Sequence, residues 1–143
     1  MSRFLTRLSL DLADEDTSSD GRGTWIVRAP LVYQSDLAGI VITAPAGLIT
    51  DLASVPRMPF AYLLTGGIGH KAAVIHDCLY TTHVVTRAVA DGVFHEALLL
   101  CGVSRWQAWL MWAGVRIGGA AAWDAPGQDQ PIAAPYAVLM RSE

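Results

Sequence analysis

The N-terminal third of the chain alternates between apolar and polar positions, a pattern typical of half-buried strands. Residues 3–11 predict a first strand, whose apolar side chains share one face except for Leu5. Residues 25–33 predict a second strand that Pro30 breaks or bulges, and because proline cannot donate to a ladder we place this strand at an edge. Residues 40–43 predict a short third strand. Together these segments predict a small antiparallel sheet.

From residue 70 onward the apolar positions recur at helical spacing. The pattern predicts helices over residues 70–82, over residues 86–101, and from residue 104 to residue 117 or 123. Thr86 and Ser104 stand where N-cap residues are expected, because a short side-chain oxygen there can accept from a free backbone N–H.

We expect the 143 residues to form one domain. It divides into a mainly β part (1–49), a loop with polar side chains (50–69), the helices (70–123) and an irregular tail (124–143). The predicted fold class is therefore α+β, with a small N-terminal antiparallel β-sheet followed by a three-helix portion.

Composition and charge exclude several classes of protein. A net charge of -3 gives no electrostatic basis for binding nucleic acid. The apolar stretch from Trp106 to Val115 is too short to cross a bilayer, and the N-terminus lacks the apolar run of a signal peptide. Two cysteines do not make a disulfide framework. We therefore expect a cytoplasmic protein without a transmembrane segment.

The third predicted helix is unusually apolar. Arg105 and Arg116 lie on one narrow edge of it, and the rest is mostly Trp, Leu, Met and Ala. This composition predicts a helix buried in the core. The alternative is a face that docks on a partner or at a membrane interface. The charged content of only 16% fits either prediction.

A cluster of polar residues interrupts the first two predicted helices. His76 and Tyr80 share a face of the first helix, with Asp77 beside them, and Arg87 and Asp91 share a face of the second. A short connection between antiparallel helices can set Asp91 against His76. A carboxylate bonded to one imidazole nitrogen fixes the tautomer and leaves the other nitrogen as a base. Asp77 would then be free to hold a cation or an arginine.

The preceding loop adds further polar side chains. Asp51, Ser54 and Arg57 are set among apolar residues, and prolines keep the loop out of regular helix. This segment could belong to the same site. A structural alternative needs no catalysis: Arg57 and Arg87 would pair with the three aspartates in a buried network that fixes the loop to the helices. A zinc site from His76, Asp91 and His95 is a further alternative.

Three motifs together resemble a family of uncharacterised small proteins from tailed phages and prophages. The resemblance covers about residues 22–123 and implies a phage or prophage gene, but it brings no established activity. It implies synthesis in the host cytoplasm and, for a virion or tail component, other phage structural proteins as partners. The motifs are Thr50-Asp51-Leu-Ala-Ser54-Val-Pro56-Arg57, His76-Asp77-x-x-Tyr80 and Arg87-x-x-x-Asp91-x-x-Phe94.

The last two motifs are also similar to those of secretory phospholipases, including the parvoviral capsid type. This resemblance implies a calcium-dependent ester hydrolase acting on a lipid or other ester. His76 would deprotonate a water, Asp91 would orient His76, Tyr80 would support the network and Asp77 would ligate calcium. The chain departs from that pattern in two respects. Its glycine-rich segment, residues 66–69, lies too close to the histidine, and the flanking half-cystines are missing.

Two hypotheses of different classes follow. The first is a phage or prophage protein with a phospholipase-like hydrolase site, which predicts an accessible imidazole at His76. The second is a non-enzymatic virion or tail component, which predicts an enclosed His76 within a structural polar network.

Overall fold

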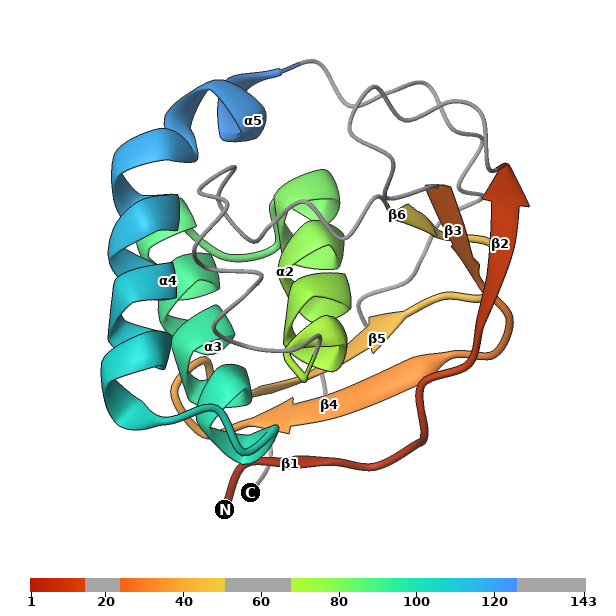
Figure 1. The fold of residues 1–143 in the computed structure, drawn as a ribbon, viewed down its shortest axis with the longest axis horizontal. Coiled ribbons are helices and arrows are strands. Elements are labelled where there is room, and N and C mark those ends of the chain that lie inside the picture. The colour runs from red at the N-terminus through yellow and green to blue at the C-terminus, as the bar shows by residue number, and fades with distance from the viewer. Residues whose placement is uncertain (15–23, 51–67, 126–143) are drawn as a thin grey trace.

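The computed structural model describes residues 1–14, 24–50 and 68–125, and its architecture is α+β. Two small antiparallel sheets come first in the chain, and four helices follow within the described residues. Figure 1 shows α2, α3 and α4 side by side, with β4 and β5 running beneath the ends of α2 and α3. The predicted fold class is confirmed.

The first sheet has the order β1-β4-β5 and is antiparallel throughout. Its strands are β1 (Arg3–Phe4), β4 (Leu31–Ser35) and β5 (Ile40–Ala44). Every second residue of β4 is buried, as expected for a strand with one face on the core. This sheet forms the floor under the helices.

The second sheet has the order β2-β3-β6. Its strands are β2 (Leu10–Asp14), β3 (Thr24–Val27) and β6 (Ile49–Thr50). β6 is two residues long, but it determines where Thr50 lies relative to the helices. Thr50 is paired in register with Trp25 of β3.

Two strand predictions were wrong in the same way, because the chain changes sheets where one continuous strand was expected. The first predicted strand is divided into β1 and β2, and the second into β3 and β4. Pro30 lies between β3 and β4, so its missing N–H interrupts no ladder, and neither strand is at an edge. At the first division the Thr6 hydroxyl donates to the Pro30 carbonyl and accepts from Val32 N–H, which ties the connection to the start of β4.

The helices begin and end close to their predicted limits. They are α2 (His70–Thr82), α3 (Arg87–Leu100), α4 (Arg105–Gly118) and α5 (Ala120–Asp124). Thr86 caps α3 by accepting from Val89 N–H. Ser104 occupies the N-cap position of α4 but makes no side-chain capping hydrogen bond, and its hydroxyl donates to the side chain of Gln107.

The third predicted helix is interrupted at Gly119, which separates α4 from α5. A Cβ added at Gly119 would collide with the carbonyl oxygen of Val115 and lie 2.6 Å from the hydroxyl of Tyr80. Glycine is therefore required here for close approach rather than for an unusual backbone angle. This contact links the end of α4 to the polar cluster on α2.

The core lies between the helices and the β1-β4-β5 sheet. Helix α2 is buried along most of its length. Helix α3 contributes one buried face, which contains Asp91 and the apolar residues around it. The largest fully buried side chains are Tyr33, Phe94, Leu31, Ile75, Leu79, Leu98 and Met111.

Helix α4 differs from the prediction of a buried helix. Only Ala108, Met111 and Val115 are buried in it, while Trp106 and Trp109 are each 56% exposed. The reason is that α4 packs on α3 at the periphery, so only one side of it is covered (Figure 1). None of the helices described here is long and apolar enough to cross a membrane.

Candidate functional site

The centre of the site is a contact between the middle of α2 and the first turns of α3. His76 Nε2 lies 2.8 Å from Asp91 Oδ1. His76 is 2% exposed and Asp91 is fully buried. The apolar spacing of both helices explains this, because each polar residue falls on the face that packs against the other helix. The predicted contact between these two residues is therefore present.

Asp91 accepts hydrogen bonds from side chains of two helices, α2 and α4. The Tyr80 hydroxyl donates to Oδ1 at 2.7 Å, and Arg116 Nη1 of α4 donates to Oδ2 at 2.8 Å. Arg87 Nη1 is farther away, at 3.8 Å from Oδ2, and donates to the Arg116 carbonyl at 3.3 Å. A buried carboxylate needs such partners, because burial without them is costly.

These contacts determine the charge of Asp91. Burial by itself raises the pKa of the carboxyl, but hydrogen bonds from His76, Tyr80 and Arg116 outweigh that effect. The pKa of Asp91 is lowered overall, so the group is a carboxylate at neutral pH. The same burial, with the adjacent carboxylate, raises the pKa of Tyr80, whose hydroxyl therefore remains a donor.

His76 is the complementary neutral partner. Burial lowers the pKa of the imidazole, and the hydrogen bond to Asp91 opposes this only in part. Because a carboxylate can only accept, we assign the single ring proton to Nε2, which leaves Nδ1 with a free lone pair. Nδ1 is buried and has no hydrogen-bond partner among the residues that the structure describes. The ring is held between Tyr80 and Phe94, with centroid distances of 4.1 and 4.7 Å.

The two imidazole nitrogens therefore differ. The hydrogen bond from Nε2 to Asp91 fixes the tautomer and the ring orientation, and the Asp91 carboxylate stabilises a proton added at Nδ1. Nδ1 can therefore accept a proton or ligate a metal. An unsatisfied polar atom in the interior is uncommon in folded proteins and calls for an explanation.

Accessibility at His76 differs from what the hydrolase hypothesis predicted. Its side chain is 3% exposed, not open to solvent. Tyr80 and Phe94 pack against the ring, and Asp91 lies against Nε2. Enclosure is the outcome that the structural alternative predicted.

The other predicted site residues are placed as follows. Asp77 is half-buried and accepts from the Thr50 hydroxyl of β6. The residues Asp51, Ser54 and Arg57 lie outside the described residues. Within residues 1–14, 24–50 and 68–125, no group of three or more His, Cys, Asp or Glu side chains could hold a metal ion. The zinc set with His95 is therefore not formed there, and the ring of His95 instead meets that of Trp112 edge-on.

Sequence reasoning missed the role of Arg116. It placed Arg105 and Arg116 on the same edge of the helix and assigned a partner to neither. The signal was present, because an arginine near the end of an otherwise apolar helix needs a compensating group. The angular difference of about 20° between the two residues was too small to separate them.

A second polar cluster was also missed. Glu96 of α3 accepts from the hydroxyls of Ser2, Tyr33 and Ser35, and from the backbone N–H of Leu37. Burial and the Glu96 carboxylate raise the pKa of Tyr33, so its hydroxyl stays protonated. The cluster fastens β4 and the residue before β1 to α3, and none of these residues belongs to the His76 site.

Comparison with known proteins places the chain in a family without an assigned activity. A family model described as a protein of unknown function (DUF1353) matches residues 25–115, well over half of the chain. No curated protein and no solved structure matches. The match includes all of α2 and α3, and hence His76, Tyr80 and Asp91. The chain therefore belongs to the DUF1353 family of proteins of unknown function.

Proposed function

We propose that this protein is a phage- or prophage-encoded ester hydrolase in which His76 acts as the general base. The observation that carries the proposal is the different hydrogen bonding of the two nitrogens of His76. Nε2 is hydrogen-bonded to the Asp91 carboxylate, while the lone pair of Nδ1 has no partner within residues 1–14, 24–50 and 68–125. A network that only held helices together would not need a neutral base poised against an ionised carboxylate.

The chemistry follows from the two nitrogens. His76 Nδ1 removes a proton from water as the water oxygen attacks the ester carbonyl carbon. Asp91 stabilises the imidazolium through Nε2–H, and the imidazolium returns the proton to the leaving alkoxide as the C–O bond breaks. The products are an acid and an alcohol, and one water is consumed. Positioned general-base catalysis of this kind contributes about 100- to 10,000-fold.

Tyr80 and Arg116 act as positioning residues. Both donate to Asp91, Tyr80 to Oδ1 and Arg116 to Oδ2, so they hold the carboxylate in its orientation without touching the reacting atoms. Water and ester must reach Nδ1, so catalysis requires a displacement of the side chains that enclose the ring. Lipid esters are the substrates suggested by the similarity to phospholipases.

Calcium dependence belongs to the same proposal, through Asp77. Among the residues that the structure describes, Asp77 and the Thr50 hydroxyl bring two oxygens together. Calcium takes about six to eight oxygen ligands, so these two do not by themselves make a calcium site. The proton transfers at His76 therefore do not involve the metal. Rates measured with calcium and with a chelator test the dependence directly.

The decisive variant is His76→Gln. The glutamine amide can donate to Asp91 from near the position of Nε2, but it offers no base at the position of Nδ1. We expect wild-type protein to hydrolyse a fluorogenic phospholipid and a soluble short-chain ester, and the variant to lose at least 100-fold in rate on both. Thermal unfolding should change little. Absence of wild-type hydrolysis on both substrates, with and without calcium, would refute the proposal.

A second candidate is a non-enzymatic virion or tail component. The enclosure of His76 and the convergence of donors from α2 and α4 on Asp91 favour it. In this case His76→Gln would have no catalytic effect, and the protein would be found by mass spectrometry in purified particles. Absence from the particles would count against this candidate.

A further inference from the structure

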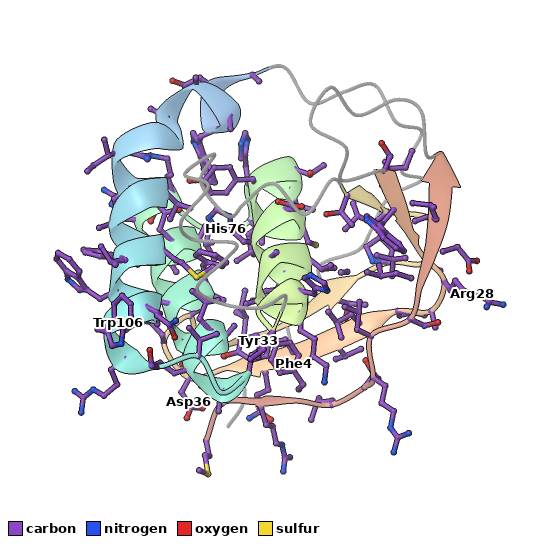
Figure 2. The ribbon with its side chains drawn as sticks, viewed as in Figure 1. Phe4, Arg28, Tyr33, Asp36, His76 and Trp106 are labelled. Atoms are coloured by element: carbon purple, nitrogen blue, oxygen red, sulfur yellow. The ribbon has the colours of Figure 1, made fainter. Side chains whose placement is uncertain are left out.

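We infer that the outer face of α4 binds a lipid surface. Four exposed apolar residues and the half-buried Ala113 lie on one side of this helix, within an arc of about 100°. Trp106 and Trp109 are each 56% exposed and Ile117 is 86% exposed. Figure 2 shows Trp106 at the periphery on α4, whereas His76 lies in the interior between the helices. The α4 outer face consists of Trp106, Trp109, Leu110, Ala113 and Ile117.

This face is the reverse of an ordinary surface helix, whose solvent side is polar. The polar side chains of α4 are directed elsewhere. Arg116 reaches inward to Asp91, and Gln107 accepts from Ser104 at the N-terminal end. Arg105 is exposed at the edge of the face, and α4 has no acidic residue. Nothing on this helix repels an anionic headgroup, and its edge is cationic.

The size of the face decides between a lipid surface and a second copy of the chain. A 14-residue helix is about 21 Å long and about 10 Å across, which gives an area on the order of 200 Å². A stable protein interface buries about 800 Å² on each partner. A lipid surface has no such minimum, because an amphipathic helix inserts its apolar side into the headgroup boundary residue by residue. Tryptophan is also enriched at that boundary.

The position of α4 connects this face to the His76 site. The same helix that presents Trp106 and Trp109 outward donates from Arg116 inward to Asp91. A bound lipid surface would therefore lie about one helix diameter from the dyad. The inference adds a substrate surface to the proposed hydrolase. Vesicle binding is measured separately from ester hydrolysis, however. Failure of lipid binding by α4 and failure of hydrolysis at His76 can therefore be distinguished.

The test is vesicle flotation with the full chain and equimolar phosphatidylcholine and phosphatidylglycerol. We expect binding, with a blue shift of tryptophan emission. Ile117→Ser should weaken partitioning about tenfold, and Trp106→Ser with Trp109→Ser should weaken it further. Leu37→Ser is the matched control, because Leu37 is 54% exposed but lies between β4 and β5. It should bind like the wild type.

Ile117→Ser keeps the test free of folding effects, because the side chain is almost fully exposed. Failure of the wild type to bind vesicles overturns the inference, and so does equal binding by the Ile117 and Leu37 variants. Self-association in analytical ultracentrifugation that Ile117→Ser abolishes, without vesicle binding, would assign the face to a second copy instead. His76→Gln should bind vesicles normally, so loss of hydrolysis and loss of binding are read separately.

Discussion

Arg116→Met is the substitution that tests the buried network most directly. The change removes the guanidinium that donates to Asp91 Oδ2 at 2.8 Å and keeps an unbranched apolar side chain on α4. Asp91 is fully buried, and the nearest remaining cation in the described part of the chain is Arg87 at 3.8 Å. The carboxylate would keep its two donors on Oδ1 and lose its best donor on Oδ2.

The magnitude follows from that geometry. Removing one partner of a fully buried ion pair costs about 3–5 kcal/mol. Arg116 is 32% exposed and Arg87 partly compensates, so we expect the lower value of a hydrogen bond to a charged group, about 2 kcal/mol. For a chain of this size, that loss lowers the melting temperature by roughly 5–8 °C.

The matched control is Arg105→Met. It makes the same chemical change on the same edge of α4, at an exposed side chain for which we expect an effect within about 0.5 kcal/mol. Urea denaturation followed by circular dichroism at neutral pH measures both variants. Equal stabilities for the two variants would refute the role assigned to Arg116.

The pH dependence provides a second measurement on the same pair. The folded-state pKa of Asp91 is lowered, so its contribution to stability is present above the unfolded-state pKa of about 4 and is lost as pH falls through the folded-state pKa. Arg116→Met raises the folded-state pKa. The stability gap between wild type and variant should therefore narrow below about pH 4. A gap that widens in acid would contradict the assignment of Asp91 as the ionised partner.

Three further predictions use matched changes elsewhere. Gly119→Ala should destabilise by about 1–3 kcal/mol because its Cβ would meet Tyr80 and the α4 backbone, whereas Gly118→Ala meets nothing and should be near neutral in the same urea assay. Tyr80→Phe should cost about 1.5–3 kcal/mol by removing a donor to Asp91, and titration of tyrosinate absorbance should show one fewer tyrosine with a raised pKa. Thr86→Ala should cost about 1 kcal/mol in thermal unfolding, and Ser104→Ala much less, because only Thr86 caps its helix.

The sequence determined the limits of α2 and α3 almost completely. The limits of α2 match the prediction, and Thr86 caps α3 as expected. Helix periodicity and capping involve residues within four positions of one another, so they are readable locally. The contact of His76 with Asp91 links two different helices, but it was predictable from the pattern of each helix. Both side chains lie on apolar faces of helices joined by a short connection, which restricts how the two faces can meet.

The strands and the surroundings of the site were decided by long-range packing. Alternation predicts a strand, but it does not say that the chain leaves one sheet for another near Thr6 or at Pro30. Helix periodicity also does not distinguish Arg105 from Arg116. Only the packing of α4 on α3 directs Arg116 to Asp91. The exposure of Trp106 and the enclosure of His76 are also set by how the helices pack on one another. A local pattern shows which residues share a face, whereas the element that covers that face is set by contacts far apart in the chain.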